Sequence, residues 1–275
     1  MTATTRAAQA GLAILAFTTA AAAGDWELRV CADPDNLPFS NRAGEGFDNR
    51  IAEIVARELG AALTWVWLPD LKGRTRQLYV QGGACDLVMG VIESQPGFLT
   101  SYAYYRTGYV FLYPETAPFD VTNLNDPALR DLRIGVPGGH AKTVPPSIAL
   151  ANRGIVANQV HFIDKREDGA PWPPLLEALG AGEIDLAIAW GPTAGAYAKA
   201  KGGLVVAPVK PEIDFPFLPM VAPLTFGVRP EDEGLRDDID LALSRSWDET
   251  RAVLAEAGVP LIDLPPPAPS LEEGG

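Results

Sequence analysis

Two kinds of hydrophobic pattern alternate along residues 24–264. Short runs rich in β-branched and aromatic residues separate segments whose apolar residues recur at helical spacing. In the first part, the runs predict strands at 28–32, 63–68, 85–90 and 109–113, and the periodic segments predict helices at 47–59 and 75–81. The order strand, helix, strand, helix, strand indicates a parallel sheet with helices packed against it.

The same pattern restarts near residue 131. Strands are predicted at 131–136, 159–163, 184–190, 204–209 and 224–228, with helices near 148–152, 175–180 and 192–201. An apolar stripe then predicts one long helix through Leu235, Ile239, Leu243, Trp247 and Leu254. Lys210–Pro219 carries three prolines and is therefore excluded as a central strand. No repeat period is visible.

Two α/β units in series, followed by a strand and a helix, predict an α/β chain of two lobes, each a doubly wound sheet flanked by helices. We expect lobe 1 to comprise residues 24–114 and 222–264, and lobe 2 residues 115–221, with hinge crossings near 114 and 221. The carboxyl ends of the strands of both lobes are expected to face a cleft. The proline-rich end, residues 265–275, is expected to be a disordered tail.

The first 23 residues resemble a secretory signal peptide. Arg6 precedes the apolar run Gly11–Phe17, and small residues follow up to Ala23, where cleavage is expected. The alternative is a membrane anchor, but the apolar run is shorter than the roughly 20 residues that span a bilayer. We therefore expect an exported chain with no membrane span after cleavage.

Composition excludes several classes of protein. Of the 275 residues, 47% are hydrophobic, which is enough for a large core and rules out gross disorder. There are 22 Lys and Arg against 35 Asp and Glu, a net charge of −13. Cleavage after Ala23 would remove Arg6, leaving 21 against 35, or −14. So acidic a chain is not expected to bind nucleic acid or anionic lipid.

The chain has two cysteines, Cys31 and Cys85. An even number in an exported chain favours one disulfide over two buried free thiols. In a sheet whose strands run in the order second, first, third, Cys31 lies beside the strand that Cys85 begins. No metal site is expected, because His140 and His161 are far apart in sequence and Asp33-Pro34-Asp35 lacks the later ligands of a calcium loop.

Several motifs resemble those of the type II periplasmic solute-binding fold, in the order in which that fold presents them. They are Gly46-Phe47-Asp48, Asp86–Met89, Ile134–Gly139 and Glu183–Ala187. Four others resemble a narrower family, the quinoprotein dehydrogenase-associated solute-binding-like proteins, which includes the J proteins of methanol dehydrogenase gene clusters. These are Val30–Ser40, Cys85–Val91, Tyr104-Tyr105-Arg106 and Ala189-Trp190-Gly191-Pro192.

The resemblance implies a non-enzymatic periplasmic accessory protein. Its expected partner is a pyrroloquinoline quinone (PQQ)-dependent methanol or alcohol dehydrogenase, which it helps to assemble or activate, with a c-type cytochrome as a further partner. PQQ and a metal ion would belong to that enzyme, and no cofactor is expected in this chain. Two alternatives are a transporter-linked receptor for a small, weakly charged or aromatic solute, and an enzyme like the cyclohexadienyl dehydratases. The last needs converging acid and base groups, and Glu93 is the only obvious acid near a strand end of lobe 1.

The chain departs from the amino-acid binders of this fold at two places. Those proteins pair the ligand carboxylate with an Arg shortly after the third strand, but Val91–Phe98 contains no Arg. They hold the ligand ammonium with an acid near the position of Trp190, where this chain has Trp190-Gly191-Pro192. Because charged groups are costly to bury unpaired, tight binding of free amino acids is not expected.

The predicted cleft is lined by aromatic rings and lacks charges, which suits an apolar or aromatic guest, including a peptide of a partner protein. Gly138-Gly139-His140 is either an anion site at a helix start or a tight turn. No residue is predicted to be catalytic. The candidate cleft residues are Asp33, Asn36, Pro38, Phe39, Ser40, Trp67, Glu93, Tyr104, Tyr105, Arg106, Gly138, Gly139, His140, Trp190 and Pro192.

Overall fold

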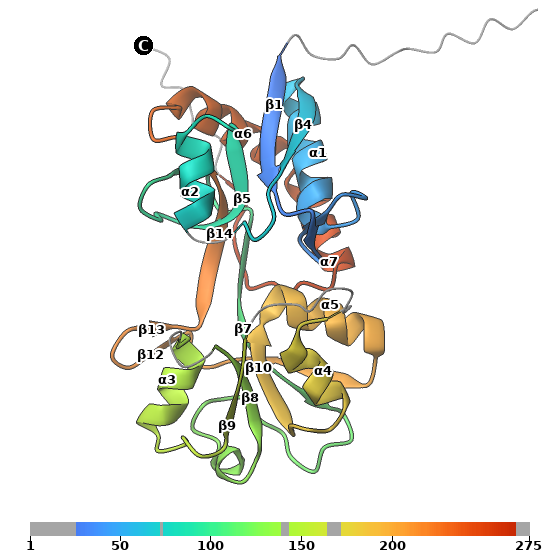
Figure 1. Cartoon of the computed structure of the whole chain (residues 1–275), viewed down its shortest axis with the longest axis vertical. Coiled ribbons are helices and arrows are strands. Elements are labelled where there is room, and N and C mark those ends of the chain that lie inside the picture. Colours follow the sequence, from blue (N-terminus) through green and yellow to red (C-terminus); the bar gives the residue numbers. More distant parts are fainter. Residues whose placement is uncertain (1–25, 72–73, 139–142, 164–171, 268–275) are drawn as a thin grey trace, which may run out of the picture.

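The computed structural model describes residues 26–71, 74–138, 143–163 and 172–267. The expected signal peptide and residues 268–275 of the expected tail lie outside these ranges. The described chain forms two bodies stacked along the long axis of the molecule, with β7 (Tyr105–Pro114) and β14 (Val221–Val228) running between them (Figure 1).

The upper body, lobe 1, is built on three parallel strands. They are β1 (Glu27–Ala32), β4 (Ala62–Trp67) and β5 (Leu87–Ile92), in the order β4-β1-β5, and β14 pairs antiparallel with β5. The helices are α1 (Phe47–Leu59), α2 (Arg74–Gln81), α6 (Glu233–Arg245) and α7 (Trp247–Glu256), and the short strands are β2 (Asp35–Asn36), β3 (Ser40–Asn41) and β6 (Leu99–Thr100). Phe47, Ile51 and Val55 of α1 are buried, as the helical spacing predicts.

The lower body, lobe 2, repeats this order of strands. Its parallel strands are β8 (Ile134–Pro137), β9 (Gln159–Phe162) and β10 (Leu186–Trp190), in the order β9-β8-β10, extended by antiparallel β7 and β11 (Leu204–Pro208). The helices are η1 (Pro127–Arg130), α3 (Pro145–Asn152), α4 (Pro174–Gly180) and α5 (Gly191–Lys201), and β12 (Ile213–Asp214) and β13 (Leu218–Pro219) form a hairpin. The predicted two-lobed α/β fold is confirmed.

The chain first passes between the lobes inside β7. Tyr105 pairs with β14 and belongs to the upper core, whereas Val110 pairs with β10 and belongs to the lower core. The passage thus lies before Pro114 rather than at it, because one ten-residue strand is shared by both halves of the sheet. On the return, Met220 lies in the lower core and Ala222 in the upper core.

The predicted long helix near the C-terminus is wrong in one respect, because it is broken into α6 and α7 at Ser246. The backbone there leaves helical geometry, with φ −108° and ψ 18°. The Ser246 hydroxyl donates a hydrogen bond to the Ala242 carbonyl oxygen at 2.8 Å. Bonding of a serine side chain to the carbonyl four residues earlier bends helices. The apolar stripe survives the break, since Ile239, Leu243 and Leu254 are all buried.

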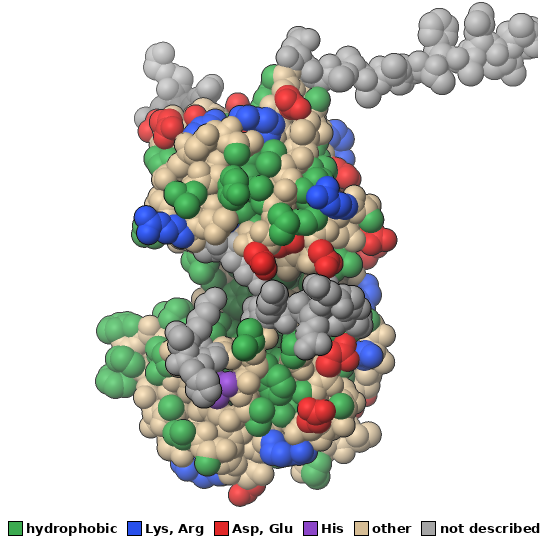
Figure 2. Space-filling view, viewed as in Figure 1, with side chains coloured by type: hydrophobic (Ala, Val, Ile, Leu, Met, Phe, Trp, Pro, Cys, Tyr) green, Lys and Arg blue, Asp and Glu red, His purple; other side chains and the backbone are tan. Residues whose placement is uncertain are grey.

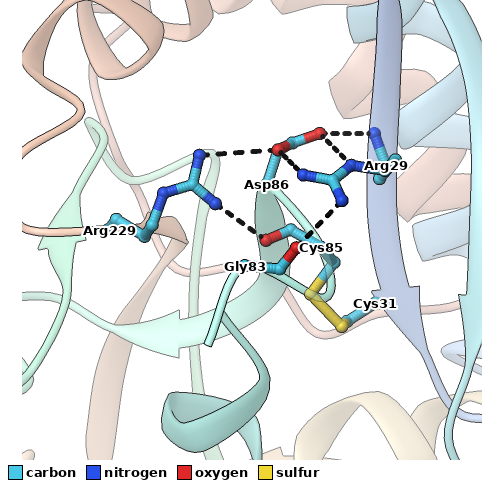
Figure 3. Close-up of a disulfide and its surroundings, with 6 residues drawn as sticks. All are labelled: Arg29, Cys31, Gly83, Cys85, Asp86 and Arg229. Atoms are coloured by element: carbon cyan, nitrogen blue, oxygen red, sulfur yellow. Dashed lines mark hydrogen bonds and ion pairs between the residues drawn. A yellow bond between two sulfur atoms is a disulfide. The ribbon is translucent and has the colours of Figure 1, made fainter. Parts of the chain in front are cut away.

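The predicted disulfide between Cys31 and Cys85 is present, with a Cα–Cα distance of 5.6 Å (Figure 3). Cys31 lies on β1 and is paired with Val88 of β5, so the bridge joins neighbouring strands at the start of β5. It therefore fixes the first and third strands of lobe 1 to each other.

Candidate ligand or partner cleft

A cavity of about 1070 Å³ lies between the lobes, and both contribute to its walls. Its upper wall comes from the carboxyl ends of β1 and β5 and the loops after them, and its lower wall from β8, β10 and α4. Figure 2 shows the molecule hollowed at this level, with hydrophobic side chains inside and acidic ones along the edge of the upper lobe. Both sheets thus present their strand ends to one space, as the fold predicts.

The upper wall is charged, so the prediction of a cleft without charges is wrong. The charged residues that line the cavity are Asp33, Asp35, Asp48, Asp70 and Arg76. Among the described residues of lobe 2, by contrast, the lining is uncharged: Tyr109, Pro137, Gly138, Val144, Phe162, Ile163, Pro173, Leu175, Leu176, Ala189, Trp190 and Thr193. An occupant that touches both walls would meet ionic groups on one side and apolar groups on the other.

Arg76 and Asp48 are two partly buried charged residues of the upper wall, and their charges attract each other. Arg76 extends from α2 and donates from Nη1 and Nη2 to the Gly90 carbonyl oxygen at 2.9 and 3.1 Å. Asp48, in the first turn of α1, accepts a hydrogen bond from the Tyr104 hydroxyl at 3.0 Å. Burial raises the pKa of Asp48 to about 7, although the Tyr104 hydrogen bond and the Arg76 charge oppose this rise. Burial also lowers the pKa of Arg76, against the attraction of Asp48.

The loop Asp33–Ser40 is held in shape by its own polar groups. Asp33 Oδ1 accepts from the Asp35 amide at 3.0 Å, and the Asp33 carbonyl oxygen accepts from the Ser40 hydroxyl at 2.8 Å. Gly46 lies so close to this loop that a Cβ atom there would be 2.1 Å from the Phe39 carbonyl oxygen. The glycine of Gly46-Phe47-Asp48 is therefore required by packing, and it brings Asp48 to the cavity.

The structure divides the sequence-predicted cleft residues into three sets. The residues that line the cavity are Asp33, Asn36, Phe39, Ser40, Tyr105, Gly138 and Trp190. The ones that lie away from its lining are Pro38, Trp67, Glu93, Tyr104, Arg106 and Pro192. Gly139 and His140 lie outside the described residues.

Each residue that is absent from the lining has another place in the fold. Tyr104 is fully buried in the upper core and reaches the site only through Asp48. Trp67 stacks on Trp65, with ring centroids 5.3 Å apart, and it is Trp65 that lines the cavity. Arg106 forms an ion pair with Glu212.

Three residues remain. The Pro38 carbonyl oxygen accepts a hydrogen bond from the Phe47 amide at 2.9 Å, at the start of α1. Glu93 is exposed in the turn after β5. Pro192 is buried in the first turn of α5, beside a tight packing of Gly191. A Cβ atom at Gly191 would lie 2.6 Å from the Gly108 carbonyl oxygen and 2.8 Å from Thr107 Oγ1. The sequence Trp190-Gly191-Pro192 thus has a structural reason, with only its tryptophan facing the cavity.

Sequence reasoning missed Asp48, Arg76 and Phe162 as cavity residues. Asp48 is part of the motif Gly46-Phe47-Asp48, so its place at the cavity could have been predicted from the sequence. Arg76 carried no signal, because it comes from the first turn of a helix rather than from a strand end. Phe162 was placed on the correct strand, but its face was not predicted.

Within the described ranges, no group of three or more His, Cys, Asp or Glu side chains is placed to hold a metal ion. In the same part of the chain, no helix is long and apolar enough to cross a membrane.

No family model matches the chain, but individual proteins do. Protein MoxJ of Methylorubrum extorquens is 30% identical over 258 residues, which cover 86% of this chain and 82% of MoxJ. The crystal structure of MxaJ from Methylophaga aminisulfidivorans has a TM-score of 0.73 and 29% identity, covering 86% of this chain and all of MxaJ (100%). The crystal structure of the periplasmic binding protein XoxJ from Methylobacterium extorquens has a TM-score of 0.69 and 32% identity, with coverage of 86% and 100%.

These similarities extend over both lobes and the cavity between them, and they agree with the two-lobed architecture and its repeated order of strands. On this evidence, the chain belongs to the MoxJ family, whose fold is that of the type II periplasmic binding proteins.

Proposed function

We propose that this protein is a non-enzymatic periplasmic accessory protein that binds a PQQ-dependent methanol or alcohol dehydrogenase and helps to assemble or activate it. The observation that carries the proposal is the similarity to MoxJ over 86% of the chain. PQQ and the metal ion belong to the partner enzyme in this proposal, and a c-type cytochrome is a further partner.

The cavity supports a large occupant rather than an enclosed small solute. Its volume of about 1070 Å³ is at the upper end of the roughly 300–1,000 Å³ of small-molecule sites. Its lining combines half-buried rings from both lobes, such as Phe39 and Trp190, with acidic groups of the upper wall. A segment of a partner protein with apolar and basic side chains would satisfy both walls.

The test is capture of the dehydrogenase from periplasmic extract by the tagged mature chain, residues 24–275. The expected result is that the dehydrogenase is enriched over an extract passed through tag alone, and is identified by its PQQ absorbance and by mass spectrometry. Recovery of a bound small solute, with no dehydrogenase above the level of the tag alone, would contradict the proposal.

The contribution of the cleft rim is tested with Trp190→Ala. The matched control is Trp26→Ala, because Trp26 is 41% exposed just before β1, outside the cavity lining. If the rim makes contact, only Trp190→Ala weakens dehydrogenase binding at an unchanged melting temperature. If both variants bind the dehydrogenase equally well, the rim makes no contact with it and has only a structural role.

A second candidate function is reception of a small aromatic or weakly charged solute, and the presence of Arg76 and Asp48 in the cavity lining is the observation that favours it. Arg76 is directed to the Gly90 carbonyl from α2, and the segment after β5 supplies no arginine for an amino-acid carboxylate. Calorimetric titration with the standard amino acids is expected to give no submicromolar affinity. A submicromolar affinity would favour the receptor over the accessory protein.

A further inference from the structure

The segment between β11 and β14 carries an exposed aromatic hairpin. Strands β12 and β13 pair Ile213 with Pro219 and Asp214 with Leu218, and the tip between them is Phe215-Pro216-Phe217. Phe215 is 83% exposed and Phe217 is 89% exposed. In Figure 2 hydrophobic side chains protrude from the left edge of the lower lobe, where Figure 1 places β12 and β13.

The base of this hairpin is fixed by a buried ion pair. Asp214 is 7% exposed and receives two hydrogen bonds from Arg153, at 2.6 and 2.8 Å. Arg153 Nη1 also donates to the Ala149 carbonyl oxygen of α3 at 2.9 Å. The Met220 amide donates to the Glu212 carbonyl oxygen at 2.8 Å, which closes the base. The two rings are therefore held out in a defined direction.

The exposed rings contribute almost nothing to the core of this chain. Phenylalanine is among the residues most often buried, and each ring buries roughly 150–250 Å² when it is covered. Two adjacent rings on a fixed projection thus leave a large apolar area in water. Such an arrangement is typical of an interface anchor, which loses little ordering entropy on binding.

The charges around the tip indicate which surface it fits. Residues 210–219 contain Lys210, Glu212 and Asp214, and the tip Phe215-Pro216-Phe217 itself is uncharged. Arg106 and Arg153, which contact this segment, are both in ion pairs with it. Both acids of the segment are thus paired, and it is the net charge of −13 on the whole chain that disfavours an anionic bilayer as the partner. A protein pocket with an apolar floor and a basic rim is complementary to the tip and to this charge.

The size of the tip indicates the role of the contact. Two covered rings account for roughly 300–500 Å², which is below the approximately 1,200 Å² of a specific, stable interface. The tip is therefore suited to be the central anchor of a larger contact rather than the whole of one.

Resting on the proposed function, we propose that the Phe215-Pro216-Phe217 tip inserts into an apolar pocket with a basic rim on the partner dehydrogenase. The hairpin then supplies the affinity anchor, and the net negative charge of this chain guides the approach of the two proteins. This interaction surface is separate from the cavity, because none of the hairpin residues lines it.

The test compares the unaltered mature chain with Phe215→Ala/Phe217→Ala and with the control Leu78→Ala. Leu78 is 60% exposed on α2 of the other lobe, so the control removes apolar surface elsewhere. Binding to the purified dehydrogenase is measured by biolayer interferometry and folding by melting temperature. The double variant is expected to bind at least about 30-fold more weakly, as hot-spot anchors do. Its melting temperature is expected to be unchanged, as is binding by Leu78→Ala.

The outcomes separate the hairpin from the proposed function. If the unaltered chain does not bind the dehydrogenase, both proposals fail. If the unaltered chain and the double variant bind equally well, the hairpin inference alone is overturned. Binding to anionic vesicles, or self-association of the unaltered chain, that is lost in the double variant while dehydrogenase binding persists would also overturn it.

Discussion

The two lobes contain the same arginine–aspartate contact at the same register of their sheets. In lobe 1, the Arg29 amide and Nε donate to Asp86 Oδ2 at 2.9 and 3.1 Å. In lobe 2, the Arg133 amide and Nε donate to Asp185 Oδ2 at 2.8 and 3.1 Å. Each contact ties the first strand of its lobe to the start of the third. A shared register makes the differences between the lobes directly comparable.

The lobes differ in what lies next to this contact. Lobe 1 has the Cys31–Cys85 disulfide, two residues after Arg29 and one before Asp86 (Figure 3). The equivalent positions of lobe 2 are Gly135 and Ile184. A Cβ atom at Gly135 would lie 2.3 Å from Ile184 Cδ1, so an isoleucine side chain covers a glycine there. The first and third strands are joined by a covalent bond in lobe 1 and by side-chain packing in lobe 2.

Removing the disulfide is the largest expected perturbation. The cysteines are 54 positions apart in the sequence, so Cys31→Ala/Cys85→Ala is expected to lower the free energy of unfolding by about 4 kcal/mol, because the unfolded chain gains entropy. Urea unfolding with and without reductant measures this. A loss below about 1 kcal/mol would mean that packing alone holds the first and third strands of lobe 1 together, as it does in lobe 2.

The second test removes the acid of each contact. Asp86→Asn is expected to cost about 2–3 kcal/mol, because its side chain is 13% exposed and faces both Arg29 and Arg229. Asp185→Asn is the matched variant, and it should cost less than half as much because its side chain is 31% exposed. Equal losses by urea unfolding would show that the lobes do not differ in this contact.

A smaller effect is expected at the covered glycine. Gly135→Ala should cost about 1–2 kcal/mol, because the added methyl group would overlap Ile184 Cδ1 at 2.3 Å and Leu175 Cδ1 at 2.5 Å. Ile184→Val removes the nearer of these atoms, so the double variant should recover part of the loss. The measurement is the melting temperature of all three variants, and no recovery would contradict the packing account.

The smallest expected difference between the two contacts is in how they affect stability at low pH. Desolvation would raise the pKa of Asp86, but the hydrogen bonds from Arg29 outweigh it and lower the pKa; hydrogen bonds from Arg133 lower that of Asp185. Both folded pKa values therefore lie below the unfolded value of about 3.9. Their stabilisation is present above about pH 4 and is lost as pH falls through the folded values. Below pH 4, the free energy of unfolding should fall less steeply with pH in each Asn variant than in the unaltered chain. The effect should be larger for Asp86→Asn than for Asp185→Asn. Equal slopes in the unaltered chain and both variants would contradict this.

The sequence predicted the features that depend on local pattern. The order of strands, both α/β units and the disulfide follow from periodicity and cysteine count. The repeated arginine–aspartate contact was not visible, because its partners are separated by 57 residues in lobe 1 and 52 in lobe 2. Because these separations differ, the repeat is not visible in the sequence and appears only when the two folded sheets are compared.

The cavity lining was harder to predict because it depends on single-residue register. Tyr104 and Tyr105 are neighbours that are both buried in the upper core, with ring centroids 4.8 Å apart, yet only Tyr105 also lines the cavity. Arg76 reaches the cavity from α2, and its position follows from the packing of that helix. The proline count correctly kept Lys210–Pro219 out of the central sheet, but it did not reveal that two phenylalanines there are exposed.

The most direct test of the account is calorimetric titration of the mature chain into a purified PQQ-dependent methanol dehydrogenase, at low and at physiological salt. We expect saturable binding of defined stoichiometry that weakens as salt increases, because an acidic chain approaches a basic surface. No saturable binding at either salt concentration, in a preparation whose melting curve shows a folded chain, would contradict it.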